Sequence, residues 1–204
     1  MTLPPFSVTW DYLCPFARNA HEHLLTGLDA GAPWEVTFTP FSLMQNHVAE
    51  GEPPVWEAED HATKVKGLLA LQAGVVVRDR FADRFPAVHR GLFAARHDRS
   101  QHLEDPAVVS AVLDAAGVPA AEVLAEIAEG WPLEQVRLAH EASVKDHGVF
   151  GVPTFVVDDK AVFVRLMTRP GDDGASARQT VDTVVELMVA RPEINEFKYT
   201  SISR

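Results

Sequence analysis

Cysteine is almost absent from this chain of 204 residues, because Cys14 is its only one. A single cysteine excludes a disulfide within the chain and suits a protein kept in a reducing compartment. No apolar run approaches the roughly 20 residues that a bilayer-spanning helix needs. The first residues lack the basic stretch and the long apolar stretch of a secretory signal. We therefore expect a cytoplasmic protein with no membrane partner.

Basic residues are also scarce. The chain has 18 Lys and Arg against 29 Asp and Glu, which gives a formal net charge of −11. The negative electrostatic field of such a chain repels phosphate backbones and argues against a nucleic-acid partner. Apolar residues make up 47% of the chain, enough to bury the core of one medium domain or of a small domain with an insertion.

The hydrophobic pattern predicts strands at both ends of the chain and helices between them. Residues 6–10 alternate as a strand, Pro15 suits the first turn of a helix that continues over 16–28, and alternation returns from Trp34. This order predicts a parallel β-α-β unit. Near the C-terminus, residues 153–157 and 160–166 form a predicted hairpin across two aspartates, and a helix follows over 175–190.

Between these ends the sequence shows almost only helical pattern. The predicted helices cover residues 61–74, 84–97, 105–117, 119–128 and 132–147. We therefore expect an α/β fold in which residues 1–50 and 148–204 form one domain, and residues 51–147 form an all-helical insertion.

Cys14 stands at the start of the first predicted helix, directly before Pro15. Unpaired N–H groups and the positive end of the helix dipole stabilise a thiolate there. A free cysteine has a pKa of about 8.5, and we expect Cys14 to titrate and alkylate well below that value. The alternative is that Cys14 is a small buried apolar residue, as most lone cysteines are.

A second motif, G-V-F-G-V-P-T-F-V-V, places Pro153 at the start of a strand. Together with the Cys-Pro pair it resembles the thioredoxin superfamily. The helical block narrows the resemblance to the DsbA family, including its cytoplasmic FrnE-like branch and actinobacterial members that use mycothiol. The resemblance extends from Phe6 to about Ala190. It implies a thioredoxin-like fold, β-α-β then β-β-α, with a helical insertion.

The resemblance also implies roles for individual residues. Cys14 matches the nucleophile of the family, and Val152–Pro153 matches a cis-proline loop that faces it. We therefore expect this peptide bond to be cis. The backbone of this loop pairs with an extended substrate or with the tail of a small thiol. The residues expected to bind substrate or thiol are Asp11, Pro15, Val152, Pro153, Thr154, Arg165 and Arg169.

Ala17 departs from the family pattern, which has a second cysteine there to release the product. The leading interpretation is thus a DsbA-like oxidoreductase with one cysteine and no tightly bound cofactor. An external low-molecular-weight thiol, mycothiol or glutathione, would resolve its adducts with small-molecule or peptide disulfides or electrophiles. Two alternatives stay open. One is an enzyme like the kappa-class glutathione transferases or 2-hydroxychromene-2-carboxylate isomerases, and the other is a non-catalytic binding module.

Other polar residues have two interpretations each. Asp11 either accepts a proton from the thiol or, as we favour, shapes the turn before the helix. Arg165 and Arg169 bind carboxylates of a peptide-like thiol or are solvated charges. His21 and His23 diverge on a helix, and the loop predicted over residues 96–102 lacks a recognisable ligand spacing, so we expect no metal site.

The remaining candidates surround the expected site. The family resemblance places the insertion over the active site, so three side chains of the insertion are expected to contribute to ligand binding: His89, Arg96 and His97. Three aromatic residues form a further candidate, an apolar wall around the thiol: Trp10, Phe16 and Phe150. The sequence leaves the oligomeric state open, a homodimer included.

Overall fold

A mixed four-stranded sheet organises residues 3–199, the part of the chain that the computed structural model describes. Its strands are β1 (Phe6–Trp10), β2 (Val36–Pro40), β3 (Thr154–Val157) and β4 (Lys160–Phe163), in the order β2-β1-β3-β4. β1 pairs with β2 in parallel, whereas β3 is antiparallel to both β1 and β4. The predicted β-α-β unit and the predicted hairpin are thereby confirmed.

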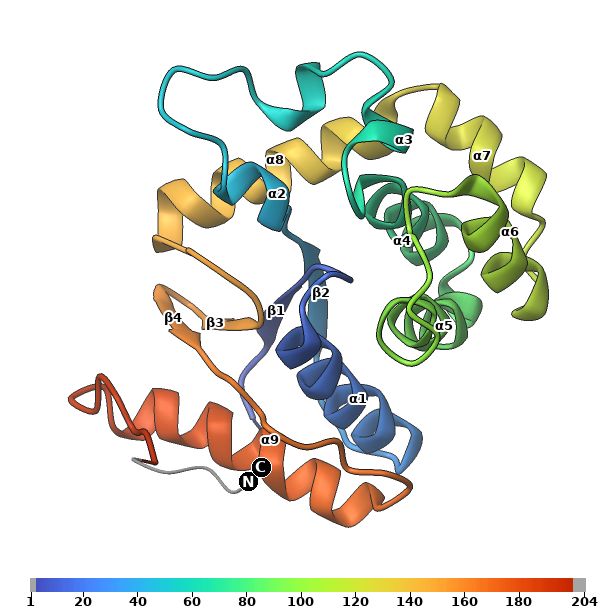
Figure 1. Ribbon diagram of the computed structural model, residues 1–204. Helices are drawn as coiled ribbons and strands as arrows, with labels where there is room; N and C mark the ends of the chain where they lie inside the picture. The colour runs from blue at the N-terminus through green and yellow to red at the C-terminus, as the bar shows by residue number, and fades with distance from the viewer. Residues whose placement is uncertain (1–2, 200–204) are drawn as a thin grey trace.

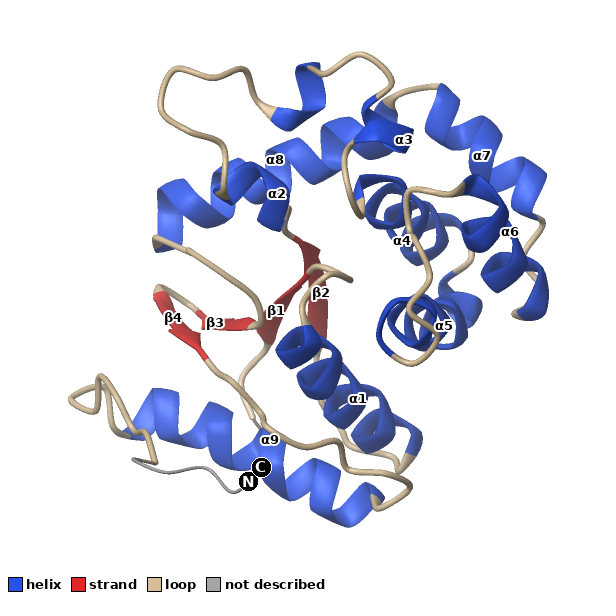
Figure 2. Cartoon of the chain, viewed as in Figure 1, coloured by secondary structure: helices blue, strands red, loops and turns tan. Residues whose placement is uncertain are grey.

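Helices make up most of the remaining chain (Figures 1 and 2). They are α1 (Pro15–Asp29), α2 (Leu43–Asn46), α3 (His61–Lys64), α4 (Leu68–Arg80), α5 (Phe85–His97), α6 (Pro106–Ala115), α7 (Ala120–Ala128), α8 (Trp131–His147) and α9 (Gly174–Ala190). Two short 3₁₀ turns, η1 (Val55–Glu57) and η2 (Ala82–Arg84), complete the described elements.

The first of two hydrophobic cores lies between the sheet, α1 and α9, which pack against each other (Figure 1). Alternate residues of β1 point to one face, so Phe6 and Val8 enter this core, where Leu24 of α1 and Val181 of α9 meet them. The sequence of α1 suits its position, since Cys14 caps its N-terminus and Pro15 occupies the first turn, where no N–H is needed.

The second core belongs to the helical segment between β2 and β3. It collects the buried faces of α4 to α8, and it also takes in Trp10, Tyr12 and Cys14 from the end of β1 and the turn that follows. Val149 and Val152, just before β3, belong to it as well. The thiol therefore lies where the helical segment meets the sheet, and residues distant in sequence decide how much water reaches it.

Three details differ from the sequence expectations. The single helix predicted over residues 61–74 is wrong: α3 ends at Lys64, before the extended Val65, and Gly67 adopts a left-handed conformation (φ 74°) that begins α4 separately. The short helix α2 was not predicted; Ser42 begins it by accepting a hydrogen bond from the Gln45 N–H. Arg96 and His97 form the last turn of α5, as the helix predicted over residues 84–97 implies, so the loop predicted over 96–102 begins only after them.

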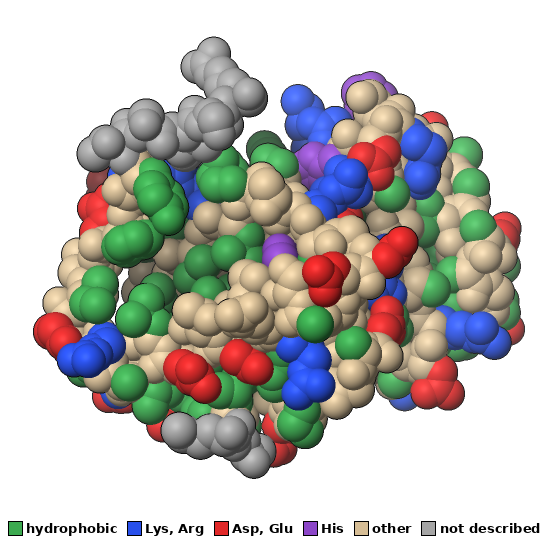
Figure 3. Space-filling model, turned by 90° about the horizontal axis from the view of Figure 1, so that it is seen from below, with side chains coloured by type: hydrophobic (Ala, Val, Ile, Leu, Met, Phe, Trp, Pro, Cys, Tyr) green, Lys and Arg blue, Asp and Glu red, His purple; other side chains and the backbone are tan. Residues whose placement is uncertain are grey.

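The surface carries charges of both signs. On the face seen from below, where α9 lies, acidic and basic side chains are interspersed with apolar ones (Figure 3). Within residues 3–199, no helix combines the length and the apolar character required to cross a membrane.

Candidate active site

Cys14 is held between the first turn of α1 and the segment before β3. Its Sγ accepts a hydrogen bond from the Ala17 N–H at 3.4 Å and donates one to the Val152 carbonyl oxygen at 3.2 Å. Only 9% of the residue is exposed. The sequence expectation that Cys14 occupies the helix start, facing the Val152–Pro153 loop, agrees with this arrangement.

The expectation of a lowered thiol pKa is wrong for this state of the protein. Burial raises the pKa of the Cys14 thiol, the N–H groups of Ala17 and Phe16 offset this in part, and the charge of Asp11 raises it further. The helix start does favour the thiolate, but removal of water outweighs it. In this conformation the thiol donates its hydrogen bond to the Val152 carbonyl oxygen, a bond that only the protonated form can make.

The loop opposite the thiol has its carbonyl groups fixed one after another. The Phe150 oxygen accepts the Asn46 side-chain amide at 2.8 Å, and the Gly151 oxygen accepts the Thr154 hydroxyl at 2.8 Å. The Val152 oxygen accepts the thiol. The Val152–Pro153 bond is cis, as the motif suggested. Beyond it, the Thr154 N–H donates to the Thr9 hydroxyl at 2.9 Å and joins the loop to β1.

Asp11 is buried and shapes the turn before Cys14, in line with the favoured interpretation. One carboxylate oxygen accepts the Leu13 N–H at 2.9 Å, and the other accepts the Leu43 N–H at 2.7 Å. Burial raises the pKa of Asp11 to about 6, although these two N–H groups lower it. Asp11 thus joins the active-site turn to α2.

Sequence reasoning missed a buried relay of side chains behind the thiol. His21 Nε2 lies 3.1 Å from the Thr9 carbonyl oxygen, His89 Nε2 lies 3.0 Å from His21 Nδ1, and the Tyr12 hydroxyl lies 2.8 Å from His89 Nδ1. A carbonyl only accepts, so His21 donates from Nε2, His89 donates to His21, and Tyr12 donates to His89. We call Tyr12, His89 and His21 the relay.

Both imidazoles of the relay are neutral. Burial lowers the pKa of His21 to about 4, and burial with the nearby His21 and Arg90 lowers that of His89 well below its usual value. The expectation that His89 contributes to ligand binding is corrected, because the residue is fully buried. His97 is also engaged internally, with its Nε2 donating to the Tyr12 carbonyl at 2.9 Å.

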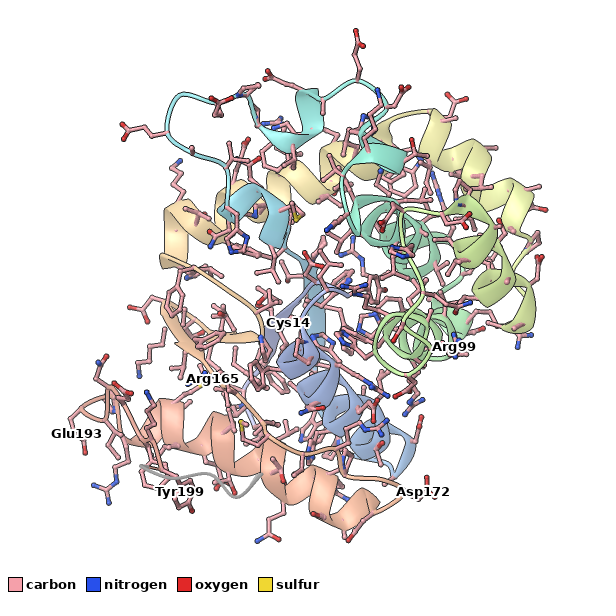
Figure 4. The ribbon with its side chains drawn as sticks, in the orientation of Figure 1. Cys14, Arg99, Arg165, Asp172, Glu193 and Tyr199 are labelled. Atoms are coloured by element: carbon pink, nitrogen blue, oxygen red, sulfur yellow. The ribbon has the colours of Figure 1, made fainter. Side chains whose placement is uncertain are left out.

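The two candidate arginines lie at different places along α1. The Arg165 guanidinium stacks over the Phe16 ring at 5.5 Å, near the start of the helix, and Figure 4 shows Arg165 on the chain segment after β4. Arg169 pairs instead with Glu22 at 3.4 Å. Eight residues of helix separate Glu22 from Cys14, which is roughly 12 Å. Of these two arginines, Arg165 is therefore the one placed near the helix start that carries the thiol.

The three candidate wall aromatics have different surroundings. Trp10 is completely buried and packs edge-on against Phe85 and His89 in the second core. Phe16 is partly buried beneath Arg165. Phe150 is 65% exposed and rests on Phe163 with ring centroids 5.2 Å apart. Only Phe16 and Phe150 therefore present apolar surface near the rim of the site, and Pro15 is exposed beside them.

Two surface pockets lie away from Cys14. One of about 640 Å³ lies between α8, α2 and η1 and includes His140, and one of about 1050 Å³ follows α1 past Arg18 and Arg169. Cys14 lines neither. His21 and His23 point apart, toward Thr9 and Thr168 respectively. Among the described residues, no group of three His, Cys, Asp or Glu side chains is placed to hold a metal ion.

Comparison with known proteins adds a family and a fold. The sequence model of the DSBA-like thioredoxin domain family matches residues 7–168. A comparison with curated proteins finds no match. Among solved structures, the cytosolic disulfide reductase DsbM from Pseudomonas aeruginosa, with GSH, has a TM-score of 0.62 at 13% identity and covers 90% of this chain and 100% of its own.

Two further structures are similar in the same way. The catalytic domain of Proteus mirabilis ScsC has a TM-score of 0.59 at 17% identity, with coverage of 91% of this chain and 83% of its own. Pseudomonas aeruginosa DsbA has a TM-score of 0.55 at 20% identity, with coverage of 93% and 85%. At these identities the likeness establishes a thioredoxin-like fold.

Proposed function

Since the chain belongs to the DSBA-like thioredoxin domain family, we propose that it is a thiol-dependent oxidoreductase that acts through Cys14 alone. The observation that carries this proposal is the position of the only cysteine. It caps α1, receives the Ala17 N–H and faces Val152 beside the cis Pro153. No second thiol stands at position 17 or anywhere else in the sequence.

The chemistry proceeds in two exchanges at Cys14 and a third in solution. The Cys14 thiol loses its proton to solvent, and the thiolate attacks a disulfide R–S–S–R′, forming Cys14–S–S–R and expelling R′S⁻. An external thiolate R″S⁻ then attacks the mixed disulfide, releasing R–S–S–R″ and the Cys14 thiolate. A second external thiol completes reduction to RSH and R″–S–S–R″, so both electrons come from the external thiol.

The site supplies specific help for the first exchange. Once the S–H bond to Val152 is broken, the Ala17 N–H remains aimed at the sulfur and stabilises the thiolate. The Val152 carbonyl is then free to pair with the backbone of a substrate or with an amide of the thiol tail. Arg165, exposed above Phe16, is the candidate partner for a carboxylate of that tail.

We propose a low-molecular-weight thiol, glutathione or mycothiol, as co-substrate, because Ala17 cannot resolve an adduct on Cys14. The similarity to DsbM, a cytosolic disulfide reductase whose structure contains GSH, supports this class of partner. A cytoplasmic location fits the same chemistry, since such thiols are kept reduced there.

The test is reduction of bis(2-hydroxyethyl) disulfide with glutathione or mycothiol supplied separately, combined with intact-mass analysis of the protein. We expect turnover only with an added thiol, a Cys14 mixed disulfide when the thiol is withheld, and loss of both in Cys14→Ser. A thioether or isomerised product with electrophilic substrates would favour a transferase- or isomerase-like enzyme. Absence of both turnover and adduct with every thiol would leave a binding module and refute the proposal.

A further inference from the structure

The segment Phe150–Val152, which we call the covering segment, ends at the carbonyl that contacts the thiol and is attached at both ends. Before it, the Val149 N–H donates to the Ser143 oxygen of α8 at 3.1 Å. After it, Thr154 is bonded to Thr9. Between these anchors, only two bonds among those described reach the covering segment from the side of the helices. They are the Asn46 amide to the Phe150 oxygen and the Cys14 thiol to the Val152 oxygen.

Asn46 reaches this segment from a helix that is itself fixed to the active-site turn. α2 begins at Leu43, whose N–H is held by the Asp11 carboxylate at 2.7 Å, and α2 ends at Asn46. The same carboxylate holds Leu13, next to Cys14. The hydrogen bonds therefore close a ring that passes from the thiol through Asp11, α2 and Asn46 to the covering segment and back to the thiol.

The two bonds of the ring that reach the covering segment are broken by different events. The thiol bond needs the S–H proton, so it is lost whenever Cys14 ionises or forms an adduct. The Asn46 bond does not depend on the state of the sulfur, and it is the part of the ring that can keep the segment in place during reaction.

We propose that Asn46 is a positioning residue that holds Phe150–Val152 over Cys14 and so limits access of thiols and disulfides to the sulfur. The side chain acts through the Phe150 carbonyl and does not touch the reacting atoms. The biological role of Asn46 rests on the proposed function, because shielding the sulfur matters only if Cys14 reacts. The physical effect itself concerns exposure of Cys14 and is measurable without any turnover.

The experiment is the rate of Cys14 labelling by iodoacetamide at fixed pH in Asn46→Ala, Asn46→Asp and the parent. One exposed neutral hydrogen bond contributes little net free energy, so we expect Asn46→Ala to label about 2- to 5-fold faster. Asn46→Asp has the shape of the natural side chain, but its carboxylate has no N–H to donate and faces a carbonyl oxygen. We expect it to label at least as fast as Asn46→Ala.

The matched control is His47→Ala, the next residue and also exposed, whose Nδ1 hydrogen bond to the Leu43 oxygen stays within α2. We expect it to label at the parent rate. The inference is overturned if Asn46→Asp labels like the parent, because shape alone would then suffice. It is also overturned if His47→Ala accelerates equally, or if faster labelling merely follows a fall in the global unfolding midpoint. If the parent shows no thiol-dependent turnover, the proposed function is refuted, but the effect of Asn46 on labelling of Cys14 is unaffected.

Discussion

Replacing Tyr12 with Phe removes one buried hydroxyl and tests the direction of the relay. The carbonyl of Thr9 requires the His21 Nε2 proton, and this assigns the donor role in turn to His89 and to Tyr12. Tyr12→Phe therefore leaves His89 Nδ1 as a buried acceptor without a partner. All the side chains of the relay are fully buried, so water does not replace the lost donor.

The size of the effect follows from that unpaired atom. A buried polar group that loses its partner costs about 1–3 kcal/mol of unfolding free energy. For a chain of this length that corresponds to a fall of roughly 2–12 °C in the melting temperature. In a His89→Leu background the hydroxyl of Tyr12 has already lost its acceptor, so the same Tyr12→Phe change should be neutral or stabilising there.

The measurement is a double-mutant cycle by urea unfolding at pH 7.5, with the parent, Tyr12→Phe, His89→Leu and the double variant. Tyr12→Phe should be destabilising in the parent and harmless in His89→Leu, which gives a coupling of about 1–3 kcal/mol. Equal costs in the two backgrounds would mean that the hydroxyl does not act through His89 and would refute the relay.

Three other changes test separate parts of the structure. His140 is 5% exposed, and its Nδ1 has no hydrogen-bond partner among residues 3–199. Burial lowers its pKa to about 4 from 6.5, so its contribution to stability is complete above pH 6.5 and is lost as the pH falls toward 4. Between pH 7 and pH 5, the free energy of unfolding of His140→Phe should therefore fall by roughly 2 kcal/mol less than that of the parent. An unchanged pH dependence in urea unfolding would contradict this. Gly74→Ala should destabilise the protein, because the new methyl group would lie 2.5 Å from the hydroxyl oxygen of Tyr12. This is the opposite of what helix propensity predicts, since alanine is the better helix former by about 1 kcal/mol, and a raised melting temperature would contradict the packing. Ala17→Cys places a second thiol on the residue whose backbone N–H contacts the Cys14 sulfur, and under oxidation the two thiols should form an internal disulfide. The disulfide is detected as a loss of two hydrogens in the intact mass, and a fully reduced product would contradict the local geometry.

The sequence predicted most elements whose determinants are local. Alternation over residues 6–10, a proline in the first helical turn and two aspartates between apolar runs were sufficient for β1, α1 and the β3–β4 hairpin, which the structure confirms. The positions at which helices begin and end were harder to predict from the sequence. Gly67 lies within a continuous helical pattern and yet begins a new helix, whereas Gly74 lies inside α4 without breaking it. Each glycine leaves room for a side chain distant in sequence, Leu13 at Gly67 and Tyr12 at Gly74, and no local pattern displays these contacts.

The relay and the Asn46 contact were not predictable for the same reason. Tyr12 and His89 are 77 residues apart, and Asn46 and Phe150 are 104 apart. Nothing in the sequence around the nine histidines, or around the eight Asn and Gln residues, gave a reason to select these. The positions of Cys14 and Val152 were predictable because two short motifs mark them, and the fold that joins the motifs is known from the family resemblance.

The pKa of Cys14 shows how the two kinds of information combine. The local feature, a sulfur at a helix start with the Ala17 N–H aimed at it, favours the thiolate and was read correctly. The distant feature, a cover of Val152 and the helical segment, removes water from the same sulfur and favours the thiol. The two terms act on one atom but respond differently to motion, since opening the cover restores water while the N–H group stays in place. If Cys14 reacts as we propose, its rate of reaction should therefore rise with the exposure of the sulfur at Val152.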